Sequence, residues 1–163
     1  MDPALYIVLA CILLLGFVIG YILRDVEVAW QETEGRTSVS AQAWAIQRML
    51  NQLLIEEHVR AEDLAILIVD GLNKDTFYGV LQRIPLPLRL SWSVEDHAAK
   101  GSVLVETVSR LKGLEKAASL LWVPESCCPK AMAESLYVGT SRAKSLLQVV
   151  GSSAACTWVR TGG

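Results

Sequence analysis

Two stretches of this chain organise the rest of it: Val103-Leu-Val-Glu-Thr-Val-Ser-Arg-Leu-Lys-Gly-Leu-Glu115 and Leu136-Tyr-Val-Gly-Thr-Ser-Arg-Ala-Lys144. Each contains a short apolar run with β-branched residues and a polar turn with glycine, which is typical of a strand and its loop. Both turns carry charged side chains. Open α/β sheets bind ligands at the ends of their strands, so the two turns are candidate binding loops.

The pattern around these stretches alternates between strands and helices. Apolar runs predict strands at residues 64–69, 88–92, 103–107, 120–123 and 146–150. A first helix starts at Ser38 or Ser40 and ends near Glu57 or His58, because apolar residues recur at helical spacing from Ile46. Further helices are predicted at about 74–82 and 129–140. This alternation with short connections predicts a three-layer α/β fold around a mostly parallel sheet.

A long apolar segment precedes this domain. The twenty residues that begin at Ala4 and end at Leu23 contain no charge, and a helix of that length matches the roughly 30 Å hydrocarbon core of a bilayer. Tyr6 and Tyr21 lie near its two ends, where interfacial aromatic residues occur. A cleaved signal peptide and a buried helix are the alternatives, but the leader has no basic n-region. The segment is therefore predicted to be a single transmembrane helix.

The residues that flank the apolar segment suggest its orientation. Asp2 precedes it and Arg24 follows it, so the positive-inside rule places the C-terminal domain in the cytosol. Gly16 and Gly20 form a Gly-x-x-x-Gly pair that would let two such helices approach and form a homodimer. The predicted organisation is a transmembrane helix at 1–24, a juxtamembrane linker at 25–39 that begins as a helical extension, a domain at 40–151 and a flexible tail at 152–163.

The net charge and the cysteine and histidine content limit which ligands the chain is expected to bind. The formal net charge is −2 over 163 residues, whereas proteins that bind nucleic acid by themselves usually carry a basic excess. We therefore do not expect nucleic-acid binding by the chain alone. The cysteines and histidines are Cys11, Cys127, Cys128, Cys156, His58 and His97. Because their spacings fit neither a zinc site nor a disulfide framework, no metal is expected and reduced thiols are the simpler interpretation.

The two opening stretches also resemble a known family. The first resembles the T-x-x-R-x-K-G-L-E motif, and the second the L-Y-V-A-x-[ST]-R-A-[KR] motif, of the second motor domain of UvrD/Rep-type superfamily 1 DNA helicases. The resemblance covers about residues 38–151 and follows the family's order. It implies a RecA-like, P-loop NTPase-type fold, here truncated and joined to a transmembrane segment.

The resemblance also implies roles for individual residues. Arg142 corresponds to the arginine finger that contacts the γ-phosphate of ATP, and Gly113 and Glu115 correspond to positions near the nucleotide and its ribose. Thr107 corresponds to a position beside the bound DNA strand, whereas Arg110 is a candidate for contact with nucleic acid because its charge could steer a phosphate. On residue type alone, the simpler interpretation of Arg142 is a surface arginine that caps a helix C-terminus. Gly113 and Glu115 can likewise be read as a solvated turn.

The chain departs from the family in several places. In the family, the Gly-x-x-x-x-Gly-Lys-[Ser/Thr] phosphate loop and the acidic pair that holds Mg²⁺ both belong to the first motor domain. This sequence contains no such phosphate loop, so no cofactor is expected unless a partner completes an ATP and Mg²⁺ site. Asp70 stands where the family often has arginine, and Lys116 where an apolar residue is usual. Trp92 and Trp122 could stack on bases, but their apolar surroundings favour the core.

Three functions are compatible with these patterns. The first is a single-pass membrane protein with a degenerate helicase-like domain, without ATPase activity of its own, that serves as an interaction or regulatory module. The second is one half of a composite enzyme, in which Arg142 is supplied in trans to a protein partner with a nucleotide-binding domain. The third is a shortened product of a longer helicase-like gene.

Overall fold

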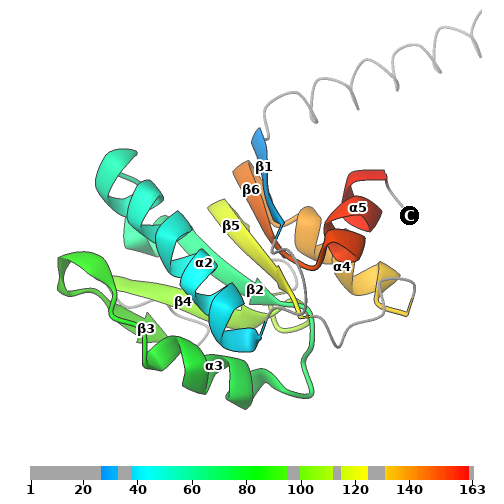
Figure 1. The fold of residues 1–163 in the computed structure, drawn as a ribbon. Helices are drawn as coiled ribbons and strands as arrows, with labels where there is room; N and C mark the ends of the chain where they lie inside the picture. The colour runs from blue at the N-terminus through cyan, green and yellow to red at the C-terminus, as the bar shows by residue number, and fades with distance from the viewer. Residues whose placement is uncertain (1–26, 33–37, 95–99, 112–114, 125–130, 162–163) are drawn as a thin grey trace, which may run out of the picture.

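The structure, a computed structural model, describes residues 27–32, 38–94, 100–111, 115–124 and 131–161. Within these residues the chain forms a six-stranded sheet with the order β1-β6-β5-β2-β4-β3 (Figure 1). Each of the five neighbouring strand pairs is parallel. The predicted α/β fold with a mostly parallel sheet is therefore confirmed.

The strands are β1 (Glu27–Glu32), β2 (Leu64–Ile68), β3 (Ser91–Ser93), β4 (Ser102–Thr107), β5 (Lys116–Val123) and β6 (Ala143–Gly151). The α-helices are α2 (Val39–Asn51), α3 (Lys74–Gln82), α4 (Ala133–Thr140) and α5 (Ser153–Thr161). A π-helical turn at Gln52–Glu56 continues α2, and short 3-10 helices lie at Ala61–Asp63 and Pro87–Arg89.

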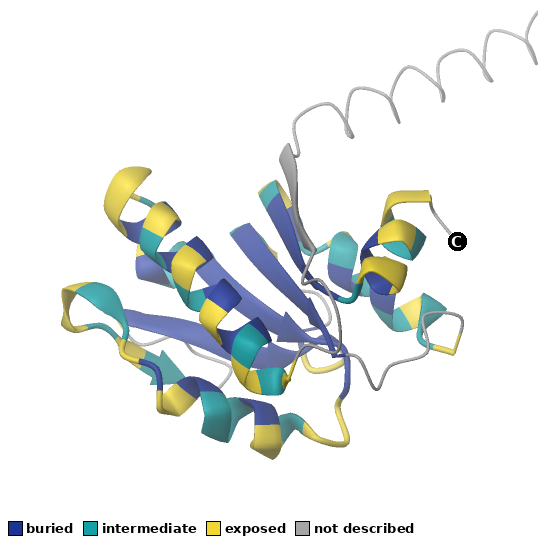
Figure 2. Cartoon of the chain, viewed as in Figure 1, coloured by how far each residue is buried: buried dark blue, intermediate teal, exposed yellow. Residues whose placement is uncertain are grey.

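Helices cover both faces of the sheet (Figure 1). On one face, α2 and α3 place Ile46 and Phe77 against Ile66 of β2. On the other face, Leu136 of α4 and residues of α5 pack with Leu67 of the same strand. All five residues of β2 are buried (Figure 2), because a parallel strand covered on both faces loses contact with water on each side. This explains the near-continuous apolar run that identified β2 in the sequence.

The first predicted helix is confirmed together with its cap. The Ser38 hydroxyl accepts a hydrogen bond from the backbone N–H of Ala41 at 3.3 Å, which satisfies one of the donors that a helix start leaves unpaired. The apolar stripe predicted from the sequence is buried at Ile46, Met49 and Leu50. The tryptophan of β5, Trp122, is also fully buried, as its apolar surroundings predicted.

Two predictions about the flanks of the domain were wrong. Residues 25–39 were expected to form a helical extension and a linker, but residues Glu27–Glu32 form β1, which pairs with β6. The apolar run in this edge strand is only three residues long, Val28-Ala-Trp30, so the local signal is weak and the pairing with β6 identifies the strand. Residues 152–163 were expected to form a flexible tail, but Ser153–Thr161 form α5, which buries Ala155 and Cys156. Small residues made this buried stripe inconspicuous in the sequence.

One predicted strand is shorter than expected. Residues 88–92 were assigned to a strand, but Pro87–Arg89 form a 3-10 turn and only Ser91–Ser93 join the sheet as β3. Proline favours such turns because its φ angle is fixed. Leu88 and Arg89 have φ angles of 56° and 54°, which are incompatible with an extended strand.

The predicted transmembrane segment at residues 4–23 lies outside the described residues, and it stays a prediction. Across the part of the chain that the structure does describe, none of the helices combines the length and the hydropathy needed to cross a bilayer.

Candidate functional site

The residues predicted to contact a nucleotide meet at the edge where the strands begin, which we call the amino edge. The expectation that both turns lie at the strand ends, where open α/β sheets bind ligands, was therefore wrong for Glu115 and Arg142. Glu115 directly precedes β5 and Arg142 directly precedes β6. These two strands are neighbours in the sheet, with Lys116 opposite Ala143. The backbone N–H of Lys116 donates to the carbonyl oxygen of Arg142 at 3.0 Å. The fold thus brings together two residues that are far apart in the sequence.

Arg142 is tied to the helix that precedes it. Its Nε donates to the carbonyl oxygen of Val138 at 3.1 Å, near the C-terminal end of α4. The guanidinium therefore satisfies a carbonyl that the helix end would leave unpaired. This is the capping role that the residue type suggested. A guanidinium has five N–H donors, so the bond from Nε leaves the terminal nitrogens available for a second acceptor.

Glu115 is paired with a lysine of β6. Its Oε2 lies 3.6 Å from the Nζ of Lys144, and the two side chains are 51% and 61% exposed. An exposed pair of this kind contributes at most about 1 kcal/mol, so a ligand could displace Lys144 at little cost. Gly113, the third predicted nucleotide residue, lies outside the described residues, and its role stays a prediction.

The residues predicted to face nucleic acid lie at the opposite edge, where the strands end, which we call the carboxyl edge. Thr107 is the last residue of β4, and its side chain is almost wholly buried. Its Oγ1 lies 3.2 Å from the Oγ of Ser109. Arg110 follows in the next turn and is exposed. Thr107 and Arg110 are thus separated from Glu115 and Arg142 by the length of the strands.

A buried carboxylate occupies the carboxyl edge beside these residues. Glu106 of β4 is fully buried. Its Oε1 accepts hydrogen bonds from the Nζ of Lys74 at 2.5 Å and from the backbone N–H of Thr107 at 2.9 Å. Its Oε2 lies 3.6 Å from the Nε of Arg110. The carboxylate therefore faces the two cations that could attract a phosphate backbone and offsets their charge.

Glu106 was not among the candidate site residues predicted from the sequence. The signal for its real role was an acidic residue inside an apolar strand, because a charge buried in such a strand requires a partner. The partner, Lys74, begins α3 on a different segment. A cation at a helix N-terminus is unfavourable with the helix dipole, and Glu106 compensates for it.

Asp70 has a structural role in the turn between β2 and α3. Its Oδ1 accepts from the backbone N–H groups of Leu72 at 3.0 Å and Asn73 at 3.3 Å. Its Oδ2 accepts from the side-chain amide of Asn73 at 2.7 Å. Aspartate is favoured in such turns because its short side chain reaches the backbone two residues on. Asp70 therefore holds the turn that leads from β2 into α3.

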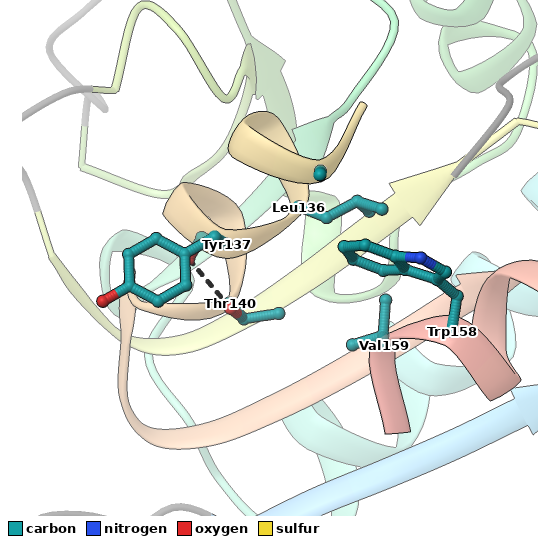
Figure 3. Close-up of a pocket in the computed structure, with 6 residues that line it drawn as sticks. Leu136, Tyr137, Thr140, Trp158 and Val159 are labelled. Carbon is teal, nitrogen blue, oxygen red and sulfur yellow. Dashed lines mark hydrogen bonds between the residues drawn. The ribbon is translucent and has the colours of Figure 1, made fainter. Parts of the chain in front are cut away.

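A shallow apolar groove lies between α4 and α5. It has a volume of about 300 Å³ and is lined by Ala133, Leu136, Tyr137, Thr140, Trp158 and Val159. Figure 3 shows Leu136 and Thr140 of α4 facing Trp158 of α5. The groove contains no charged side chain among its lining residues. Within the described residues, no group of three or more His, Cys, Asp or Glu side chains is placed to hold a metal ion.

Comparison with known proteins supports the fold. No family model matches the sequence, and no curated protein matches it. Among solved structures, the chain is similar to the C-terminal domain of a possible DNA helicase from Lactobacillus plantarum WCFS1, with a TM-score of 0.55 and 19% sequence identity. The match covers 78% of this chain and 74% of that domain. The chain therefore contains a helicase C-terminal-like α/β domain in the sense of its fold.

Proposed function

We propose that this chain is a single-pass membrane protein whose helicase C-terminal-like domain acts as an interaction or regulatory module. The domain does not hydrolyse ATP by itself. The segment from Ala4 to Leu23 anchors it in a membrane, and the domain lies in the cytosol. The likeness to UvrD/Rep-type second motor domains then reflects ancestry and fold, without the activity of a complete motor.

The observation that carries this proposal is the set of interactions that Arg142 and Glu115 make at the amino edge. Arg142 is held by the carbonyl oxygen of Val138, and Glu115 is paired with Lys144. Neither interaction needs a nucleotide. The sequence also has no phosphate-binding Gly-x-x-x-x-Gly-Lys loop, which supplies most of the backbone donors for the phosphates in motors of this type. An arginine and a glutamate without that loop support a structural role better than autonomous catalysis.

The shared position of Glu115 and Arg142 favours a second function. Glu115 and Arg142 are brought to one edge by adjacent strands, as a half-site for a nucleotide would require. In this alternative a separate protein supplies the phosphate loop, ATP and Mg²⁺, and Arg142 stabilises charge on the transferred phosphoryl group in trans. The chain would then be half of a composite ATPase.

The test uses the full chain in lipid nanodiscs. Phosphate release measures ATP hydrolysis, and a fluorescent ATP analogue with and without Mg²⁺ measures binding. We expect no hydrolysis, and the same result for Arg142→Ala and for the control Arg83→Ala, which changes an exposed arginine elsewhere. Hydrolysis that Arg142→Ala abolishes and Arg83→Ala preserves would refute the proposal. Nucleotide binding lost only in Arg142→Ala, without hydrolysis, would favour the composite enzyme.

A further inference from the structure

The chain enters the sheet through β1. β1 is an edge strand that runs parallel to β6, with Glu27 opposite Leu146 (Figure 1). Because all the paired strands are parallel, β1 begins on the side of the sheet where β5 and β6 begin. The chain therefore enters the domain from the amino edge, which carries Glu115 and Arg142.

Two lengths along the chain can be compared. From Leu23, the end of the apolar segment, to Glu27 there are four residue steps, which span at most about 14 Å when extended. From Leu146 back to Arg142 there are also four steps, which along a strand cover about 13 Å. Arg142 therefore lies about 13 Å beyond the start of β1, on the side from which the chain enters. The connection from Leu23 to Glu27 is hardly longer, at most about 14 Å. A membrane that contains the segment ending at Leu23 would lie level with Arg142.

We propose that the amino edge rests on the lipid headgroup layer, with Arg142 and Lys144 in contact with lipid phosphates. This inference rests on the membrane anchor of the proposed function. The Nε of Arg142 is bound to Val138, but the terminal nitrogens of its guanidinium can reach a phosphate. Lys144 is mostly exposed and only loosely paired with Glu115. Both side chains are therefore able to exchange their present surroundings for a headgroup.

The charges along this edge nearly balance. The residues at the beginnings of β6, β5 and β2 include the cations Arg60, Lys116, Arg142 and Lys144 and the anions Glu62, Asp63 and Glu115. Arg60 donates to Asp63 at 2.7 Å, and this hydrogen bond raises the pKa of the Arg60 guanidinium above its ordinary value. Lys116 donates its Nζ to the carbonyl oxygen of Glu62 at 2.6 Å. The short tether, and not a basic patch, thus sets the orientation.

This orientation has a consequence for the composite enzyme. A second domain of about 100 residues has a radius of gyration near 13 Å and is therefore more than about 26 Å across. The connection between the anchor and β1 allows at most about 14 Å. A partner domain therefore has no room at Arg142 while the anchor is in the membrane. Protein partners would meet the carboxyl edge or the helical faces instead.

The test is site-specific photo-crosslinking of the full chain in nanodiscs that contain phosphatidylcholine and phosphatidylserine. Benzoylphenylalanine replaces either Lys144 at the amino edge or Leu72 at the carboxyl edge, where the side chain is 96% exposed. We expect lipid adducts, detected by mass spectrometry, at position 144 and none at position 72. As a second test, a thirty-residue Gly-Ser spacer is inserted between Arg24 and Glu27. The average end-to-end distance of such a flexible spacer is roughly twice the radius of the domain. The spacer should therefore abolish the adducts at position 144.

The outcomes separate this inference from the proposed function. Alkaline extraction first shows whether the chain is integrated into the membrane. Release of the chain would overturn the anchor and the inference together. An integrated chain with equal adducts at positions 144 and 72, or with adducts that the spacer leaves unchanged, would overturn the inference alone.

Discussion

The ion pair between Lys74 and Glu106 offers the sharpest test of the packing at the carboxyl edge. In Lys74→Met, the carboxylate loses a cation at 2.5 Å while Glu106 stays fully buried. Removing one partner of a buried pair typically costs about 3–5 kcal/mol. Two features reduce the cost here: the Lys74 side chain is 14% exposed, and Arg110 lies 3.6 Å from Oε2. We therefore expect a loss of about 3 kcal/mol, against a total stability of about 5–15 kcal/mol for a typical domain.

Urea unfolding followed by circular dichroism measures this loss. The midpoint should fall while the m-value stays constant, because the surface exposed on unfolding is unchanged. The double variant Lys74→Met with Glu106→Met should recover most of the stability, since replacing both charges with apolar side chains of similar volume is often neutral. Lys100→Met, which changes an exposed lysine, is the matched control and should stay within about 0.5 kcal/mol of the wild type.

Two results would refute this reasoning. A Lys74→Met variant as stable as the Lys100→Met control would mean that water or Arg110 already solvates the Glu106 carboxylate. A double variant no more stable than Lys74→Met would mean that lost packing of the lysine stem, and not the orphaned charge, causes the destabilisation.

Two further substitutions probe the packing of the helices. A Cβ at Gly139 would lie 2.6 Å from Cδ1 of Leu121, whereas nothing lies within 4 Å of a Cβ at Gly79. We expect Gly139→Ala to destabilise the domain by about 1–3 kcal/mol and Gly79→Ala to stabilise it by up to about 1 kcal/mol. Melting temperatures of the two variants that shift in the same direction would contradict this expectation. Gln42 accepts a hydrogen bond from the indole N–H of Trp122 at 2.8 Å. The variant Gln42→Leu should therefore lose about 1–3 kcal/mol of stability. An unchanged midpoint of chemical denaturation would argue against a role for that hydrogen bond.

The sequence predicted the elements whose signals are local. Helix α3 (Lys74–Gln82) was predicted with its observed bounds because Pro85 and Pro87 prevent its continuation. The buried strand β2 was visible as an apolar run. By contrast, β1 depends on pairing with a strand at the other end of the chain, and α5 buries only small residues. Each has only a short local signal, Val28-Ala-Trp30 in β1 and Trp158-Val159 beside the small buried residues of α5, which does not by itself assign a strand or a helix.

In the candidate site, too, local features were predictable from the sequence and long-range contacts were not. The turn residues Glu115 and Arg142 were identified from motifs, but their proximity depends on β5 and β6 being neighbours, which the sequence did not specify. Glu106 was visible as an acidic residue in an apolar strand, yet its partner Lys74 lies on another segment. Ion pairs between distant segments therefore follow from the topology, and a single sequence does not encode them in any short pattern.

The pairing of β1 with β6 also affects how the chain is made. Glu27 and its partner Leu146 are separated by most of the chain, so β1 leaves the ribosome long before β6 exists. At a synthesis rate of about 5–20 residues per second, the wait is on the order of ten seconds. Until then β1 has no strand to pair with and β5 lacks one neighbour. Parallel pairing over such a separation is intrinsically slow, so completion of the sheet is a late event that a truncation removing β6 would prevent.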